Sequence, residues 1–594
     1  MTRARGLGRT AVIAVLAAAA LGLSGLPAQA GPADRPAPAD PKAPKHATVR
    51  PHARSAATHT VPNELLKDTL ADERDEGNDA PSLSALCQSF IDKPNPYRRL
   101  APNVDAIRDD GTYIVGTATG CSTAQNETTI AVNPYNPRNI VAGSNDYRFF
   151  NSRESRNDSN GIALTSFDGG RTWTNVVLPK LDFMTGATGQ LAIMDAAGDP
   201  AIAFGPHNTV YYANLVFSRA AVPAGDQGAS GLTVSVSHDG GLTWGDPSIV
   251  TLDGVAPDGS HVPTTFFNDK EWIGVDPIRG TAYVTWTHFT FDAAENYLES
   301  PILSVRSTDN GRTWSAPSRV SPSLTGFTGG ITPYAQGSNP VVAPDGALHI
   351  AYETSVCANV NCDQATDHDA VVVASSWDGG HTFRNTEVAL DFDFPGNPDV
   401  GRATLTGENF RINSFPQLAV DRLTGKLWVT WADDRNGQYT GATSVKTNGD
   451  TLVSSSPNGR DWSPVLTLGT PQDEVYPAVA VFAGRVAVTY YTRHYDPTGI
   501  KLDYAFQTGW GKFVARGHVR RITTESSDPS IQFVGVSPTG KVLQGTFIGD
   551  YSAVAMGTDF RIHPCWTDFR GSPGVTKPNQ DAVTQSISVF GEDD

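Results

Sequence analysis

The chain has 594 residues, of which 39% are hydrophobic, and its formal net charge is −17 at pH 7. This length exceeds that of one ordinary compact domain, and the acidic balance argues against a partner made of nucleic acid or anionic lipid. The 57 glycines and 41 prolines, beside 4 methionines, favour many short strands joined by turns over long helices.

The N-terminus has the features of a secretory signal peptide over residues 1–30. Arg3, Arg5 and Arg9 precede an almost wholly apolar stretch that is too short to cross a membrane. Ala28-Gln29-Ala30 is an A-x-A cleavage site. No second apolar run of about 18 residues follows. We therefore expect cleavage after Ala30 and a secreted, extracellular protein without a membrane partner.

Two segments separate this signal from the repeats. Residues 31–82 are rich in Pro and Ala and predict a disordered linker, and residues 83–119 predict an N-terminal segment that packs on the following domain. In an exported chain, Cys357 and Cys362 are close enough to predict a disulfide. The pairing among the other three cysteines stays open: Cys87, Cys121 and Cys565.

From about residue 120 the chain repeats itself. Four segments share the pattern S-x-D-x-G-x-T-W/F: Ser166 to Trp173, Ser237 to Trp244, Ser307 to Trp314 and Ser376 to Phe383. A fifth, Ser455 to Trp462, has Pro457 where the Asp belongs. The regular spacing of about 70 residues indicates one supersecondary unit per repeat.

The residues of these boxes indicate a structural role. The Asp can accept N–H groups of a tight turn, the Gly permits positive φ, and the aromatic ring buries a large apolar face between neighbouring sheets. We therefore exclude the four box acids from the candidate site: Asp168, Asp239, Asp309 and Asp378.

Two strand patterns precede each box, and two further units lack a box. The first strands of the units centre on seven positions: Ile130, Ile202, Ile273, Val341, Leu418, Val479 and Val554. Four-stranded units in a radial array make a β-propeller. The sequence therefore predicts an all-β fold, a seven-bladed propeller over residues 120–592, with six blades as the alternative.

The boxes are the hallmark of the BNR, or Asp-box, repeat, and residues 120–592 resemble a secreted member of the sialidase (neuraminidase)-like superfamily. The resemblance implies an exo-acting glycoside hydrolase, similar to exo-α-sialidases, that removes terminal acidic sugars from extracellular glycans. Propellers of this kind also include polysaccharide lyases and non-catalytic binders. A lyase, or a glycan- or protein-binding propeller, therefore remains the alternative.

One expected sialidase motif is missing. These enzymes carry an F/Y-R-I-P motif before the first box, where this chain has none. The nearest string is Phe410-Arg411-Ile412-Asn413, which lies between the fourth and fifth boxes and lacks the Pro. We interpret this string as a chance match, which weakens the prediction of sialidase specificity.

Propeller geometry predicts where chemistry would lie. The segments that lead into each first strand and out of each second strand open on one face, opposite the box turns. Glycosidases need two carboxyl groups there, or a carboxyl group and an activated Tyr. The catalytic candidates are Glu127, Asp146, Asp269, Glu271, Asp550, Tyr491 and Tyr551. We assign Asp146 or Asp269 as the acid and Tyr491 or Tyr551 as the nucleophile.

The substrate-binding candidates are cationic side chains in the same segments. Arg suits bidentate recognition of a carboxylate. We assign Arg148, Arg435 and Arg570 to anion binding, with Arg493 in reserve; the alternative is that each D-x-R pair braces the blades. His288 is a candidate base. The sequence implies no cofactor and no metal site; the expected partner is extracellular carbohydrate, and the expected state is a monomer.

Overall fold

The computed structural model describes residues 95–590, apart from 109–123, 324–332, 358–367, 393, 395, 398–401, 437, 441–442, 446–447, 532–533, 537–541, 546 and 572–578. The chain divides into Met1–Ala53 and Arg54–Asp594, and every described residue belongs to the second unit. The signal peptide, the linker, Cys87, Cys121 and Cys362 lie outside the described residues, so their roles stay predictions. Cys565 is a buried free thiol.

The described chain forms seven antiparallel sheets of four principal strands each, which we call blades one to seven. Blades one to four consist of β2 (Gln125–Val132), β3 (Ile140–Asp146), β6 (Gly161–Ser166) and β7 (Thr174–Val177); β8 (Ala196–Phe204), β9 (Val210–Phe217), β10 (Ser230–Ser237) and β11 (Ser248–Asp253); β12 (Phe266–Val275), β13 (Ala282–Phe291), β15 (Ile302–Ser307) and β16 (Ser318–Arg319); and β17 (Ala335–Val342), β18 (Leu348–Val356), β19 (His368–Ser376) and β20 (Arg384–Leu390).

Blades five to seven follow the same plan. They consist of β23 (Gln417–Val420), β24 (Leu427–Asp433), β27 (Asp450–Ser456) and β28 (Leu466–Leu468); β29 (Glu474–Phe482), β30 (Arg485–Thr492), β31 (Asp503–Trp510) and β32 (Arg520–Arg521); and β35 (Ala553–Met556), β36 (Arg561–Asp568), β37 (Asp581–Thr584) and, outermost, β1 (Val104–Asp105).

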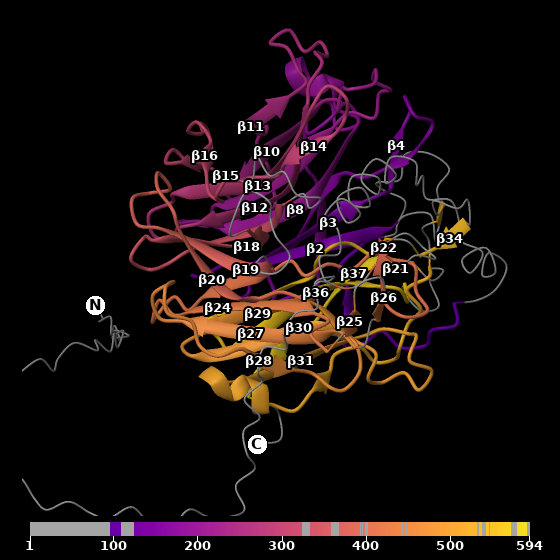
Figure 1. Cartoon of the computed structure of the whole chain (residues 1–594), viewed down its shortest axis with the longest axis vertical. Helices are drawn as coiled ribbons and strands as arrows, with labels where there is room; N and C mark the ends of the chain where they lie inside the picture. Colours follow the sequence, from indigo (N-terminus) through magenta and orange to yellow (C-terminus); the bar gives the residue numbers. More distant parts are fainter. Residues whose placement is uncertain are drawn as a thin grey trace, which may run out of the picture. The chain divides into compact units, whose positions relative to one another are not determined.

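Short elements decorate the blades. These are β4 (Phe149–Asn151), β5 (Arg156–Asp158), β14 (Tyr297–Glu299), β21 (Gly396–Asn397), β22 (Arg402–Ala403), β25 (Gln438–Thr440), β26 (Thr443–Val445), β33 (Val534–Val536), β34 (Val542–Gln544), β38 (Ile587–Ser588) and two 3₁₀ helices, Gly189–Ile193 and Gly511–Arg516. Figure 1 shows a fold made almost wholly of strands.

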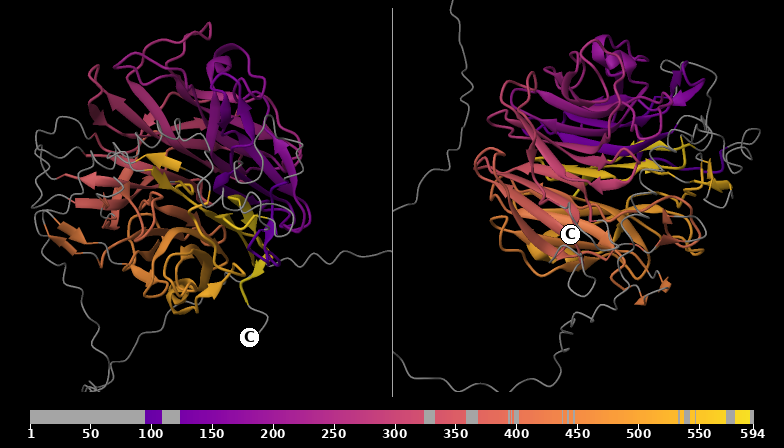
Figure 2. Two further views of the ribbon diagram at one scale, coloured as in Figure 1. Left: turned by 90° about the vertical axis from the view of Figure 1, so that its right-hand side faces the viewer. Right: turned by 45° about the horizontal axis from the view of Figure 1, so that its top comes forward.

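The blades form a closed ring. The innermost strand of each blade packs against that of the next, and β35 of the last blade packs against β2 of the first. Figure 2 shows the last strands, in yellow, beside the first, in indigo and purple. The seven predicted first strands all lie in these innermost strands, so the prediction of a seven-bladed propeller is confirmed and the six-bladed alternative is wrong.

The core consists of apolar layers between adjacent blades. Ala201, Tyr211 and Val234 of blade two pack with Ile273 and Trp286 of blade three, for example. The box aromatics extend these layers, as Trp244 of blade two does against the cluster it shares with blade one. Each blade thus buries both of its apolar faces, which a propeller allows only when its ring is closed.

The box turns have the predicted hydrogen bonds. In the second box, Asp239 Oδ1 accepts the backbone N–H groups of Leu242 and Thr243 at 3.0 Å each, and Oδ2 accepts the Thr243 hydroxyl at 2.6 Å. Gly241 has a φ of 103°, and a Cβ there would lie 2.7 Å from Val141 Cγ2 of the preceding blade. The acid therefore shapes the turn, and the glycine lets the turn dock on its neighbour.

The fifth box differs from its predicted alignment. Asn458, not Pro457, takes the place of the Asp, because its Oδ1 accepts the N–H groups of Arg460 and Asp461 at 2.9 Å each. Ser456 replaces Ser455 as the partner of the glycine N–H, at 2.9 Å. The adjacent serines allow two alignments of the box that differ by one residue, and the alignment predicted from the sequence, with Ser455 and Pro457, is wrong.

The box carboxylate should stabilise the fold in a pH-dependent way. Although partial burial opposes it, hydrogen bonds from Thr243 lower the pKa of Asp239 to about 2. Because this pKa is depressed on folding, the stabilisation is complete above about pH 4 and is lost as the pH falls through about 2. At pH 7 we expect Asp239→Ala to lower the free energy of unfolding by about 1 kcal/mol in denaturant titrations.

Two comparisons sharpen this measurement. Asp239→Asn should cost less than Asp239→Ala, since Asn458 accepts the equivalent backbone bonds in the fifth box. Leu242→Ala changes an exposed side chain of the same turn and serves as the control. Equal losses for Asp239→Ala and Leu242→Ala would show that the carboxylate contributes nothing.

Candidate functional site

Five of the seven innermost strands carry a β-bulge near their start. The register shifts lie between Asn126 and Thr129, Gly198 and Ala201, Asp269 and Trp272, Gln336 and Asn339, and Val475 and Ala478. In each bulge the first extra residue is left-handed: Glu127 (φ 52°), Asp199 (51°), Lys270 (50°), Gly337 (65°) and Tyr476 (51°). Bulges of this kind redirect side chains at the rims of closed sheets.

At the fourth bulge the left-handed residue is Gly337, which adopts this conformation without strain. A non-glycine residue in the left-handed region costs about 1–3 kcal/mol. Four of the five bulges nevertheless hold Glu, Asp, Lys or Tyr. Strained non-glycine residues of this kind are concentrated at functional sites, so these side chains mark the axial end of the innermost strands as the candidate site.

Lys270 is the centre of a buried charge cluster. Its Nζ lies 3.0 Å from Asp550 Oδ2, 3.2 Å from Asp199 Oδ2, 3.4 Å from Asp269 Oδ1 and 3.8 Å from Glu127 Oε1. These residues come from blades one, two and three and from the segment that leads into blade seven. We call them, with Arg411, the Lys270 cluster.

Arg411 adds a second cation from the segment that leads into blade five. Its Nε donates to Asp550 Oδ1 at 2.7 Å and its Nη2 to Asp550 Oδ2 at 2.5 Å. Its guanidinium group lies 4.9 Å from the centre of the Phe547 ring. Asn413 Nδ2 donates to the Asp550 backbone oxygen at 3.1 Å. Asp550 is therefore held in place by a fork of charged hydrogen bonds.

Glu127 is fixed by neutral donors. Asn145 Nδ2 donates to Glu127 Oε2 at 2.9 Å, and the backbone N–H of Asp550 donates to Oε1 at 3.1 Å. Asn145 Oδ1 in turn accepts the backbone N–H of Asp199 at 2.9 Å. One amide side chain thus links two bulges of neighbouring blades.

The pKa values of the Glu127 and Asp550 carboxyl groups are shifted in opposite directions. Burial and the charge of Asp199 raise the pKa of Glu127 well above its usual value, although Lys270 opposes the shift. Burial also opposes ionisation of Asp550, but Arg411 and Lys270 outweigh it and hold its pKa far below the usual value. The cluster therefore favours the protonated form of Glu127 and the ionised form of Asp550.

Glu271 and Tyr551 complete the surroundings. Burial raises the pKa of Glu271 well above its usual value, and neither carboxyl oxygen has a hydrogen-bond partner among the described residues. Tyr551 is half-buried, stacks edge-on against Trp272 at 5.0 Å, and directs its hydroxyl to Pro200 O at 3.4 Å. Tyr551 therefore connects the segment before blade seven with blades two and three.

The structure brings together five predicted site residues: Glu127, Asp269, Glu271, Asp550 and Tyr551. It adds Asp199, Lys270 and Arg411, which the sequence prediction missed. The available signal for Arg411 was the Phe410-Arg411-Ile412-Asn413 string, which we interpreted as a chance match and which lies at the cluster. Lys270 stands between two acids in the sequence, a pattern that gives no sign of burial.

The three D-x-R pairs have one common geometry. The Arg Nε donates to the Asp two residues earlier at 2.8–2.9 Å, and Nη2 donates to its second oxygen at 2.6–2.7 Å, in Asp146–Arg148, Asp433–Arg435 and Asp568–Arg570. The side chains of Arg148 and Arg570 are fully buried. A substrate carboxylate would have to displace the paired Asp, so these pairs favour the bracing alternative.

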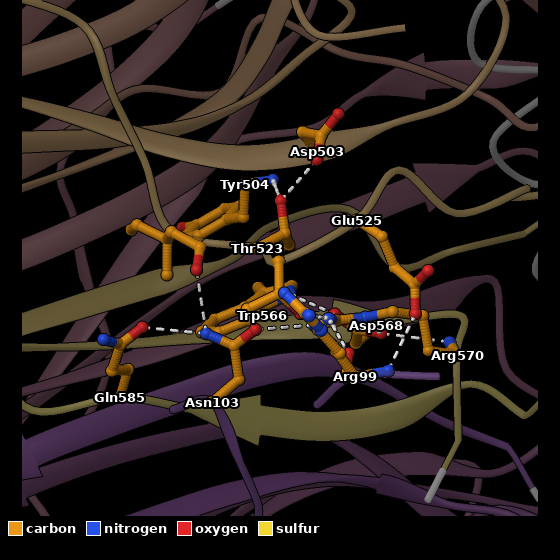
Figure 3. A network of polar contacts seen from close by, with 12 residues as sticks. Arg99, Asn103, Asp503, Tyr504, Thr523, Glu525, Trp566, Asp568, Arg570 and Gln585 are labelled. Carbon is orange, nitrogen blue, oxygen red and sulfur yellow. Dashed lines mark hydrogen bonds and ion pairs between the residues drawn. The ribbon is translucent and has the colours of Figure 1, made fainter. Parts of the chain in front are cut away.

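Figure 3 shows the further contacts of the Arg570 guanidinium group beside its pairing with Asp568. Its Nη1 donates to Arg99 O at 3.0 Å and Thr524 Oγ1 at 2.8 Å, and its Nη2 donates to Asn103 Oδ1 at 2.8 Å. Asn103 Nδ2 continues to Gln585 Oε1 at 2.8 Å. This Arg570 network ties the segment before β1 to blade seven.

The remaining predicted residues lie in separate contacts. Arg493 binds Asp473 at 3.1 Å and Glu408 at 3.3 Å. Tyr491 donates to Thr567 O at 3.0 Å and accepts its N–H at 2.9 Å.

His288 lies 3.3 Å from Asp253, a residue of the outermost strand of blade two, and its ring stacks on Phe266. A Tyr–Glu contact occurs elsewhere, between Tyr334 and Glu353 of blade four, where both side chains are buried.

No protein-family model and no curated protein matches the sequence. Solved structures resemble the chain at low identity. Hadza microbial sialidase Hz136 has 14% identity and a TM-score of 0.38, covering 76% of this chain and 73% of its own.

Two further structures match at a similar level. The NanB sialidase of Streptococcus pneumoniae has 12% identity and a TM-score of 0.36, covering 86% of this chain and 73% of its own. The α-L-arabinanase of Penicillium chrysogenum, complexed with arabinobiose, has 14% identity and a TM-score of 0.30, covering 54% and 94%. The likeness is one of fold and carries no activity over to this chain.

Within the described ranges, no helix is long and apolar enough to span a membrane. Over the same residues, no group of three or more His, Cys, Asp or Glu side chains could hold a metal ion.

The Arg570 network predicts that removing the guanidinium group of Arg570 lowers the stability of the fold and leaves ligand binding unchanged. Arg570→Lys keeps the charge but cannot bind Asp568, Asn103 and Arg99 O together. We expect a loss of about 2 kcal/mol in the free energy of unfolding, and faster amide exchange in β1. Arg520→Lys, an exposed Arg of the adjacent blade, is the control. Unchanged exchange in β1 would contradict the bracing role.

Proposed function

We propose that the chain is a glycoside hydrolase that acts at the Lys270 cluster, with Glu127 as proton donor and Asp550 as the carboxylate that faces the anomeric carbon. The observation that carries this proposal is the approach of Glu127 and Asp550 to one ammonium nitrogen, at 3.8 Å and 3.0 Å, in surroundings that shift the pKa values of the two carboxyl groups in opposite directions. Glycoside hydrolysis needs such a pair, because one carboxyl must give a proton while the other stays ionised.

The cations of the cluster would position the pair. Lys270 and Arg411 keep Asp550 ionised, so that it can stabilise positive charge at the sugar ring or attack it. Asn145 and the Asp550 N–H hold Glu127 by its oxygens, which leaves its proton for a leaving group. Burial strengthens each of these interactions, since they act in a medium of low effective dielectric constant.

The charges of the Lys270 cluster bear on the charge that a substrate can carry. The resemblance to sialidases implies a terminal acidic sugar, but Lys270 and Arg411 already face carboxylates of the protein. An anionic sugar would therefore meet acidic groups without a free countercharge. We propose a neutral terminal sugar as the substrate. The predicted signal peptide supports glycans outside the cell.

The test is turnover of a panel of fluorogenic glycosides, neutral pyranosides and furanosides beside the sialoside. On the substrate that is cleaved, Glu127→Gln and Asp550→Asn should each lower kcat by about 10²–10⁴-fold. Glu474→Gln is the matched control: burial raises the pKa of this carboxyl to about 8, and its contacts are Thr470 and Thr492. Activity is expressed per folded molecule, measured by circular dichroism.

The pH profile follows from the same pair. Activity requires ionised Asp550 and protonated Glu127, so it should fall only below the usual carboxyl range and only well above it. Full activity in both variants would overturn the assignment of these residues. No turnover on any glycoside, with measurable glycan binding, would replace the enzyme by the non-catalytic binding alternative. Cleavage of the sialoside alone would overturn the neutral-sugar proposal.

A further inference from the structure

A groove lies between blades four and five on the face of the propeller that carries the box turns. The Lys270 cluster lies at the starts of first strands, whereas the box turns follow the ends of third strands, which run parallel to the first. The groove is therefore on the opposite face from the proposed hydrolase site. It has a volume of about 360 Å³, and we call it the Trp377 groove.

Four turns form the walls of the Trp377 groove. Blade four contributes Asp345, from the turn between β17 and β18, and Trp377, from its box. Blade five contributes Thr424, from the turn between β23 and β24, and Asn458 and Arg460, from its box. Hydrogen bonds within the two box turns and within the turn at Asp345 fix their backbones, so these walls are preformed.

Trp377 offers an aromatic surface in this groove. Its exposed fraction is 47%, although the guanidinium group of Arg460 stacks on its ring at 4.4 Å from the ring centre. The ring of His349 meets it edge-on at 6.1 Å. A sugar ring has an apolar C–H face and a rim of hydroxyl groups, so it suits an open aromatic surface that is surrounded by polar side chains.

His349 adds a buried polar atom to the wall of the groove. The residue is 4% exposed, and its Nδ1 lies 2.8 Å from Ser375 Oγ. Among the described residues, no hydrogen-bond partner reaches its Nε2, and the side chain lines the groove. Burial lowers the pKa of His349 to about 4, although Asp345 opposes the shift, so the ring is neutral at pH 7. Nε2 can therefore form a hydrogen bond with a hydroxyl group without adding a charge.

Arg460 and Asp345 are the one cation and the one anion among the described lining residues. Both are exposed, and in the described part of the chain no hydrogen bond or ion pair involves the Arg460 guanidinium group. A guanidinium group can only donate hydrogen bonds and a carboxylate can only accept them, whereas a hydroxyl group does both. A ligand with several hydroxyl groups and no net charge therefore suits this pair better than an anion or a cation does.

We infer that the Trp377 groove binds one residue of a neutral glycan, with the sugar ring on Trp377 and its hydroxyl groups on Asp345, His349 and Arg460. The volume agrees with this ligand. A water molecule takes up about 30 Å³, so the groove has room for about twelve atoms of that size, and a hexopyranose has this number of heavy atoms. The site is independent of the proposed hydrolase activity. A polymer held here leaves the opposite face of the propeller open.

The test is affinity electrophoresis of the full chain through gels that contain arabinan, galactan, xylan or mannan, with polygalacturonate as the anionic comparison. At least one neutral polymer should retard the wild type, and polygalacturonate should retard it less. Trp377→Ala should weaken binding about tenfold, because it removes the aromatic surface. Trp377→Phe should weaken binding less, since it keeps a ring. Asp345→Asn should also weaken binding less, since its amide oxygen still accepts a hydrogen bond.

Phe167→Ala is the matched control, because Phe167 takes the place of Trp377 in the first box and is 44% exposed. It should be retarded as the wild type is. Unchanged binding in Trp377→Ala, no retardation by any of the four neutral polymers, or stronger retardation by polygalacturonate would overturn the inference.

A variant of the opposite face separates the two sites. Asp550→Asn should be retarded as the wild type is. Loss of retardation in Asp550→Asn, with unchanged retardation in Trp377→Ala, would show that the glycan occupies the Lys270 cluster and would overturn the inference. Failure of the hydrolase proposal leaves the result expected for Trp377→Ala unaffected.

Discussion

Closure of the ring is the constraint on which the rest of the structure depends. A blade has two apolar faces, and each needs a neighbouring blade, so an open row of sheets would expose an apolar face at both ends. The chain meets this requirement by packing β35 against β2 and by adding β1 to the sheet that contains β37. The Arg570 network then fixes the first described segment to the last blade through buried, charged hydrogen bonds.

Closure also creates the axis, and with it the candidate site. The innermost strands of blades one, two and three and the segments that lead into blades five and seven meet at the Lys270 cluster, although Glu127 and Asp550 are 423 positions apart in the sequence. Bulges turn Glu127, Asp199 and Lys270 toward that point. Because the site is buried, a shift in charge pairing becomes a large shift in pKa, which is how two neighbouring carboxyl groups can hold opposite protonation states.

The sequence predicted the fold better than the site, and the reason is the range of the interactions involved. Strand alternation, box turns and their spacing are local, so all seven innermost strands could be located. The predicted alignment of the fifth box was wrong by one residue, because Ser455 and Ser456 both fit the serine position of the pattern. At the site, sequence position placed Glu127, Asp269 and Asp550 on the correct rim. It could not show that Arg148 and Arg570 bind the Asp two residues earlier, or that Arg411 crosses from blade five to reach Asp550.

The charge of the Lys270 cluster limits which ligands it can accept. At the Lys270 cluster, four carboxyl groups approach one ammonium group, so an incoming anion meets groups of its own sign. The acidic surface of the chain, with its net charge of −17, opposes the approach of any anion from a distance. Both effects favour a neutral sugar over an anionic one at the proposed hydrolase site.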